Sequence, residues 1–88
     1  MGKSSAQKRH DQSEKRRIRN KAVRSRVRTG IKNFRSAVAQ SDTTTAETSY
    51  QSVTRLMDAA VSKGVYHRNT VARLKSRLYK RLSTIQQS

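Results

Sequence analysis

The chain has 88 residues, of which 21 are Lys or Arg and five are acidic, so its formal net charge is +16. This length allows one domain at most, and 32% hydrophobic residues allow a small core but not a large one. The absence of Cys excludes disulfides and thiolate metal sites and fits a reducing compartment. We expect neither a membrane span, which needs ~18 apolar residues, nor a secretory signal.

The charge is segregated along the chain. Residues 1–40 carry 13 Lys and Arg and two acidic residues. Residues 41–62 carry one Arg and three acidic residues, and residues 63–88 carry seven Lys and Arg and no acidic residue. Such a charge opposes compaction unless a counter-charge arrives, and a phosphate backbone is its natural source. Arg outnumbers Lys by 13 to 8, which favours nucleic acid because the planar Arg fork binds phosphate oxygens in pairs.

The first predicted helix covers residues 7–40. At about 100° per residue its apolar stripe falls within one arc of about 80° and consists of Val23, Val27, Ile31, Phe34 and Val38. Ile18 lies outside this stripe, so the part of the helix before Val23 has no apolar face to bury. Gly30 lies in mid-helix, where it costs about 1 kcal/mol relative to Ala, and close approach of the second helix is the expected reason.

The second predicted helix covers residues 45–63. Thr44 and Glu47 form a predicted capping box, and Asp42 adds negative charge near the N-terminal end of the helix dipole. Gly64 is predicted to follow the helix at the C′ position. The apolar stripe consists of Ala46, Tyr50, Val53, Met57, Ala60 and Val61.

The third predicted helix covers residues 68–84, with a stripe of Val71, Leu74, Leu78, Leu82 and Ile85. No strand-like alternation competes with these patterns. The predicted connections, residues 41–44 and 64–67, are short, and short connections make neighbouring helices antiparallel. We therefore predict an all-α fold, an up-down-up three-helix bundle.

The first helix is predicted to protrude from the bundle. It would be roughly 50 Å long and the others roughly 25–30 Å, which leaves an overhang of about 20 Å or more. We predict a basic N-terminal arm, residues 1–20, that starts the long helix, and a three-helix bundle, residues 21–88. Because the arm has no intramolecular partner, we expect it to be frayed or disordered in the free protein and ordered by a polyanion.

Cations form a row beside the apolar stripe on two of the helices. On the first helix the row lies about 100° round from the stripe and consists of Arg17, Lys21, Arg24, Arg28, Lys32 and Arg35. On the third helix it consists of Arg73, Arg77, Lys80 and Arg81. A solvated surface normally mixes both signs, but residues 15–41 contain no acid. We interpret the rows as phosphate-binding faces.

No catalytic or metal-binding pattern is visible. Two His without Cys make no metal site, and no nucleophile has a base at a defined spacing. We expect no enzymatic activity, no cofactor and no small-molecule substrate. Phe34 and Tyr50 lie on core stripes, which leaves few rings for splayed bases, so a folded RNA fits better than a single strand.

Two His residues lie in basic segments. His67 lies in the turn before the third helix, where it is either a structural residue (a loop histidine or a helix cap) or a donor to a phosphate or ribose. His10 lies in the arm and is expected to face RNA.

Two segments, EKRRIRNKAVRSRVRT (14–29) and KGVYHRNTVARLKSRL (63–78), resemble the signature blocks of bacterial small-subunit ribosomal protein number twenty. KRHDQS (8–13) is similar to the basic start of some members, and the resemblance spans roughly residues 8–82. It implies a three-helix bundle whose protruding first helix is threaded among helices of the small-subunit (16S) rRNA. It also implies a ribonucleoprotein role in translation and ribosome assembly.

The resemblance implies RNA contacts on matching residues of both blocks. In the first block these are Lys15, Arg16, Arg17, Arg19, Asn20, Lys21, Arg24 and Arg28. In the second block they are Lys63, His67, Arg68, Asn69, Arg73, Lys75, Ser76 and Arg77. The basic start and the two rows add Lys8, Arg9, Lys32, Lys80 and Arg81. The family often has a basic residue where Leu74 stands and alanine near Gly30 and Tyr79. Leu74 fits the apolar stripe and is expected to face the core.

The leading hypothesis is a structural rRNA-binding protein that is cytoplasmic and ribosome-bound, with an organellar ribosome left open. It needs few or no protein contacts, no membrane and no homo-oligomer. A DNA-binding architectural protein would need a recognition helix, a dimer or side chains that wedge into the minor groove. The sequence shows no clear dimer interface. A membrane-active helix would pair its basic face with a strongly apolar one, which residues 1–20 lack.

Overall fold

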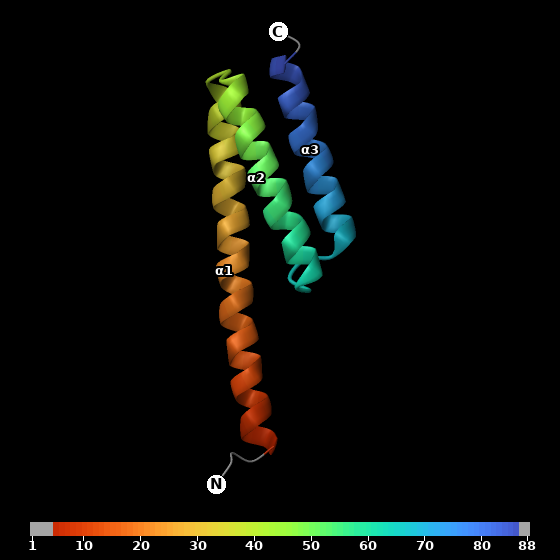
Figure 1. Ribbon diagram of the computed structural model, residues 1–88. Coiled ribbons are helices and arrows are strands. Elements are labelled where there is room, and N and C mark those ends of the chain that lie inside the picture. Colours follow the sequence, from red (N-terminus) through yellow and green to blue (C-terminus); the bar gives the residue numbers. More distant parts are fainter. Residues whose placement is uncertain (1–4, 87–88) are drawn as a thin grey trace.

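Three helices form the fold in the computed structural model, which describes residues 5–86. They are α1 (Ser5–Ala39), α2 (Thr43–Ser62) and α3 (Arg68–Gln86), and the described residues contain no strand. α1 and α3 run in one direction and α2 runs in the other (Figure 1), which confirms the predicted all-α up-down-up bundle. α1 and α2 each begin two residues earlier and end one residue earlier than predicted, and α3 ends two residues later.

The core lies where the C-terminal part of α1 runs beside α2 and α3. Its fully buried side chains include Phe34 from α1 and Val53 and Met57 from α2. The buried cluster consists of Val27, Phe34, Ala37, Ala46, Val53, Met57, Val71, Leu78 and Leu82. Leu74 packs against this cluster as expected. The three predicted stripes therefore form the core, with Ala37 as an addition.

Small residues let α1 and α2 approach each other closely. At Gly30, an added Cβ would lie 2.9 Å from Cγ2 and 3.1 Å from Cβ of Val53. The expected reason for this glycine, close approach of the second helix, is confirmed. Ala37 lies seven residues further along the same flank of α1 and is also buried. It was missed because the predicted stripe was drawn through the large apolar side chains, about 80° away from it on the helix wheel.

α2 lies between the other two helices and packs against both, whereas α1 and α3 touch at few points. The molecule is accordingly long and thin, with extents of 65 × 21 × 13 Å. Aromatic rings join the three helices, because Tyr50 of α2 contacts Phe34 of α1 and Tyr79 of α3 with ring centroids 6.1 and 6.2 Å apart. This arrangement leaves long flanks of the two outer helices open to solvent.

The predicted capping box at the start of α2 is wrong. Asp42 is the N-cap, and its carboxylate accepts hydrogen bonds from the backbone N–H of Thr45 at 3.2 Å and from the Thr45 hydroxyl at 2.7 Å. The cap lies two residues before Thr44 because Asp42 can bond both groups of one residue. Glu47 instead accepts a hydrogen bond from the Gln86 amide at 2.8 Å and thereby ties the start of α2 to the end of α3.

The end of α2 follows the prediction. Lys63 is the C-cap, and Gly64 adopts a φ of 75° in the left-handed region. The Gly64 N–H bonds to the Val61 carbonyl at 3.0 Å, and the Val65 N–H bonds to the Ala60 carbonyl at 2.9 Å. These bonds satisfy carbonyls that the helix end would otherwise leave free, and the chain turns back into α3.

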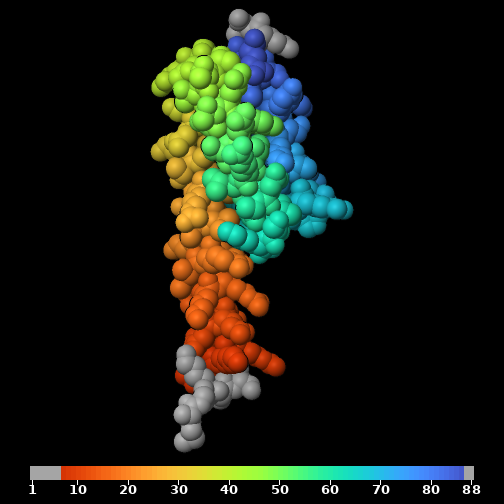
Figure 2. Space-filling view, viewed as in Figure 1, coloured from red at the N-terminus to blue at the C-terminus, as the bar shows by residue number. Residues whose placement is uncertain are grey.

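The N-terminal part of α1 extends beyond the other two helices (Figures 1 and 2). From residue 7 onward, Val23 is the first buried residue of α1, and no side chain from residue 7 to residue 22 is buried. Ile18 is 64% exposed, as expected for a residue outside the stripe. α1 is helical from Ser5 onward in this structure, so the expected fraying of the arm in the free protein stays a prediction.

The approach of α1 to α2 predicts that Gly30→Ala destabilises the protein. Ala favours the helix by about 1 kcal/mol, but overpacking against buried Val53 typically costs about 1–3 kcal/mol. In a Val53→Ala background the same change should instead stabilise. Urea unfolding of the four proteins of this double-mutant cycle measures the coupling. Equal effects in both backgrounds would show that Val53 does not set the requirement for glycine.

The Asp42 cap predicts one acid-sensitive contribution to stability. Two hydrogen bonds from Thr45 hold the pKa of Asp42 below its ordinary value of 3.8, and the bond from the Thr45 hydroxyl contributes more than the bond from its backbone N–H. A lowered pKa means that the ionised cap stabilises the fold above about pH 3.8 and that this contribution is lost as the pH falls through the folded-state pKa. Asp42→Asn should therefore lose less stability than the wild type on acidification, measured by urea unfolding. Parallel pH profiles would contradict this assignment.

Candidate nucleic-acid interface

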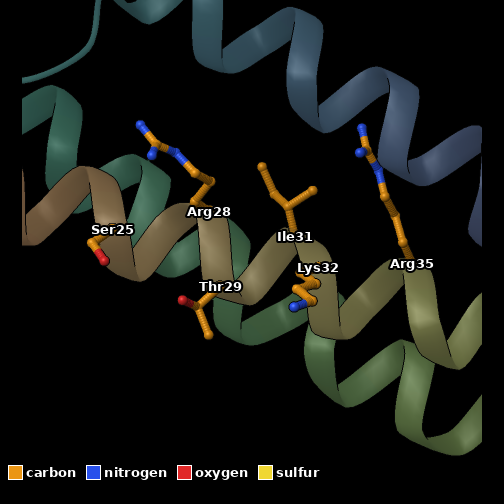
Figure 3. A pocket seen from close by; sticks show the side chains of 6 residues that line it. All are labelled: Ser25, Arg28, Thr29, Ile31, Lys32 and Arg35. Atoms are coloured by element: carbon orange, nitrogen blue, oxygen red, sulfur yellow. The ribbon is translucent and has the colours of Figure 1, made fainter.

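The cationic row of α1 lies on one exposed face of the helix and continues from the arm into the bundle. Every member of the row is exposed, namely Arg17, Lys21, Arg24, Arg28, Lys32 and Arg35. Two open hollows follow this face, one of about 370 Å³ beside Lys21 and one of about 460 Å³ beside Ile31. Figure 3 shows Arg28, Ile31 and Arg35 pointing to the side on which α3 lies, while Ser25 and Thr29 point away from it. The hollows are shallow surfaces with cationic rims, suited to an anionic chain rather than to an enclosed small molecule.

The second row lies on the opposite outer helix. Its members are exposed along α3 and consist of Arg73, Arg77, Lys80 and Arg81. Between the two rows, α2 has a single cation, Arg55, which is exposed. The positive charge is therefore concentrated on the two outer helices.

The remaining predicted contact residues divide by their exposure. The exposed ones are Lys8, Arg9, Lys15, Arg16, Arg19, Lys63, His67, Arg68, Asn69 and Ser76. Asn20 and Lys75 are partly buried. Lys75 is engaged within the protein, because its Nζ lies 2.7 Å from Oδ1 of Asp58 and joins α3 to α2.

Arg19 brings the two signature blocks together. Its guanidinium donates to the backbone carbonyl of Lys63 at 3.2 Å, across 44 residues of sequence. This carbonyl is at the C-terminal end of α2, where the helix dipole is negative and attracts a cation. Helical periodicity did not predict this contact, because the position of Arg19 relative to Lys63 depends on how α1 packs against α2.

His67 caps α3. Its Nδ1 accepts a hydrogen bond from the backbone N–H of Asn69 at 3.1 Å. One of the two open alternatives, the helix cap, is therefore confirmed. This bond requires an Nδ1 without a proton, so in the neutral ring the proton is on Nε2. The exposed side chain keeps Nε2 available as a donor, and the structure accommodates both roles.

The acids are used inside the protein. Glu14 pairs with Arg17 at 2.9 Å, Asp42 caps α2, and Glu47 and Asp58 bond residues of α3. Among the described residues no charged side chain is buried. Arg17 and Arg19 thus have partners within the protein, but no acid lies among the cations from residue 15 to residue 41, all of which are exposed.

Arg26 is a cation of α1 that belongs to neither predicted row. It is exposed and lies beside a hollow of about 370 Å³ with Gly30, Asn33 and Ser52. On the helix wheel it lies about 160° from the centre of the α1 row, so the row pattern did not include it. The signal that reveals it is the stretch of residues 15–41, which contains many cations and no acid.

The described part of the chain offers no other kind of site. No group of three or more His, Cys, Asp and Glu side chains gathers there as a metal site. None of its helices is long and apolar enough to cross a membrane.

Comparisons with known proteins agree with this picture. The model of the family "Ribosomal protein S20" matches residues 3–83, so the similarity begins a few residues earlier than the sequence motifs indicated. The chain is 44% identical over 80 residues to small ribosomal subunit protein bS20 of Syntrophomonas wolfei, with 91% of each chain covered. It is 54% identical over 72 residues to bS20 of Corynebacterium aurimucosum, covering 82% of this chain and 83% of the relative. It is 45% identical over 84 residues to bS20 of Thermobifida fusca, covering 96% of this chain and 91% of the relative. Fold, charge pattern and similarity over most of the chain thus agree, and the chain belongs to the ribosomal protein S20 family, whose members are structural proteins of the small ribosomal subunit.

Proposed function

We propose that this protein binds 16S rRNA directly through the cationic faces of α1 and α3 and stabilises the folding and assembly of the small subunit. The observation that carries the proposal is the exposed row of α1, which runs through a stretch of 27 residues without an acid, residues 15–41. Arg17, at the start of the row, pairs with Glu14, and the rest of the row repels itself until converging phosphates relieve the repulsion.

The geometry suits backbone recognition. The members of the row recur once per helical turn, about 5.4 Å apart along the axis, so one side of the helix offers a regular series of donors. Arg makes up most of the row, and its fork bonds two phosphate oxygens at once. A folded RNA presents its phosphates on converging helices, and a rod with cations along its length can neutralise several of them.

The proposed contacts lie on the basic arm, residues 1–20, and on the bundle, residues 21–88, and they spare the outer face of α2. In the arm they are Lys8, Arg9, Lys15, Arg16, Arg17, Arg19 and Asn20. In the bundle they are Lys21, Arg24, Arg28, Lys32, Lys63, His67, Arg68, Asn69, Arg73, Lys75, Ser76, Arg77, Lys80 and Arg81. Arg19 and Lys75 have an additional task, because they also hold α2 against α1 and α3.

The charge distribution predicts a strong salt dependence of binding. With about 6–10 phosphate contacts, affinity for a 16S rRNA transcript should fall by roughly 10³–10⁵ between 50 and 200 mM salt. Arg28→Gln removes one proposed phosphate contact, so it should weaken binding and lower the slope of log K against log salt by about one. Filter binding at a series of salt concentrations measures both quantities.

Arg55→Gln is the matched control, because Arg55 is an exposed Arg of α2 that lies outside both rows. It should leave affinity and slope unchanged. A flat salt profile of the wild type would contradict rRNA binding through phosphates. Equal effects of the two substitutions would contradict the proposed faces. Duplex DNA that competes as well as the transcript at equal salt would favour a general architectural role on DNA.

The unsupported arm predicts a change in protease sensitivity. Trypsin should cut the free protein rapidly at Lys15, Arg16 and Arg17, because no side chain from residue 7 to residue 22 is buried and a helix with so little support is marginally stable in water. On 16S rRNA the same bonds should be protected, while the bundle from Val23 onward should resist in both states. Mass spectrometry of the fragments reads out each site. An arm that resists trypsin in the free protein would contradict the model of an unsupported helix.

A further inference from the structure

One residue of the arm has no role in phosphate binding. Ile18 is 64% exposed and is one of two large hydrophobic side chains of the described residues that are exposed. The other, Tyr79, has its ring against Tyr50, whereas Ile18 belongs neither to the core cluster nor to the side chains packed against it. Phosphate binding does not explain why an isoleucine occupies this exposed position.

The surroundings of Ile18 determine what can cover it. Ile18 lies between Arg17 and Arg19 in sequence, and it lines an open hollow of about 220 Å³ together with Arg17 and Lys21. Arg17 and Lys21 are one helical turn apart on the same face, and Ile18 is a neighbour of Lys21 at i, i+3. Glu14, one turn before Ile18, pairs with Arg17 at 2.9 Å, but residues 15–21 carry five cations and no acid. A partner that covers Ile18 must therefore tolerate a positive surface, and this requirement favours an anionic chain over a second copy of the protein.

We propose that Ile18 is a non-electrostatic RNA contact, packed against the ribose surface of the strand whose phosphates Arg17 and Lys21 hold. The inference rests on the proposed rRNA binding and adds a second kind of contact to it. A strand held by both cations passes over the hollow between them and removes Ile18 from water. The part of the strand between its phosphates is sugar and base, and these offer the C–H surface that an isoleucine can pack against.

The chemistry of the side chain fits a sugar surface better than a base. Isoleucine has no donor or acceptor and no aromatic ring, so it can neither read a base edge nor act as a stacking platform. It is β-branched and stiff at χ1 in a helix, so it loses little side-chain freedom when it is covered. Phosphate contacts alone do not distinguish RNA from another polyanion, and a contact with ribose gives the arm a preference for a polymer that contains sugar.

Ile18→Val and Ile18→Thr form the test pair. Valine and threonine have nearly the same shape, the same charge and similar helix propensity, so they differ mainly in one hydroxyl. If Ile18 packs against ribose, Ile18→Thr should bind a 16S rRNA transcript about tenfold more weakly than Ile18→Val, because the hydroxyl is desolvated at an apolar contact. The salt slopes of the two variants should be equal, since no charge changes.

Two controls separate this contact from general effects. Ala59 is an exposed residue of α2, and Ala59→Val and Ala59→Thr should bind the transcript equally. Inorganic polyphosphate has phosphates and no sugar, so it should bind Ile18→Val and Ile18→Thr equally. Circular dichroism of the free variants should show the same helix content.

Each remaining outcome is decisive. Equal affinity of Ile18→Val and Ile18→Thr for the transcript would overturn the inference and leave rRNA binding intact. If Ile18→Val also binds polyphosphate more tightly than Ile18→Thr, by the same factor as the transcript, the inference would be overturned, because ribose would then not account for the difference. A wild-type dimer in sedimentation that Ile18→Thr dissociates, with rRNA affinity unchanged, would assign Ile18 to a second copy instead. A wild type that does not bind the transcript would overturn the proposed function and this inference together.

Discussion

The close packing of α1 on α2 is the interaction on which the rest of the molecule depends. Gly30 brings the backbone of α1 against Val53, and Ala37 and Phe34 are buried further along the same seam. The buried packing begins at Val23, and Arg19 adds a hydrogen bond to the end of α2, so the seam holds a 35-residue helix mainly by its C-terminal half. The packing of α1 on α2 therefore sets the direction of the arm. It also sets the side of the molecule on which each cation of α1 lies.

The few acids reinforce this arrangement instead of balancing the surface charge. Asp42 starts α2, while Glu47 and Asp58 attach α3 to α2. A small core gains from such links between helices because it has little apolar surface to bury. The cations of the outer helices are thereby left for a partner, which fits a member of the ribosomal protein S20 family. Membership makes the chain a ribosome-bound structural protein, as the sequence predicted, and the family is not known for enzymatic activity.

Two segments that are far apart in sequence meet at the end of α2. Arg19 from the arm bonds the carbonyl of Lys63, and His67 caps α3 a few residues later. The base of the arm is therefore attached to the turn from which the α3 row departs. If the protein binds rRNA as proposed, a strand bound at one segment would lie near the other, and the two segments would hold RNA elements at a set relative position.

Periodicity and charge in the sequence were sufficient to predict the three helices, their apolar faces, the rows and the overhang, because each depends on spacing within one helix. Apart from the close approach predicted at Gly30, they failed where the answer depended on a second helix. Ala37 is buried because of the close approach to α2, Glu47 bonds Gln86 instead of closing a capping box, and Lys75 pairs with Asp58. Arg26 was overlooked because it lies on the flank away from the row. The sequence by itself thus determined what each helix presents. Only the tertiary structure decided which cations are held inside the protein and which stay available, because that depends on distances between helices, which local spacing does not contain.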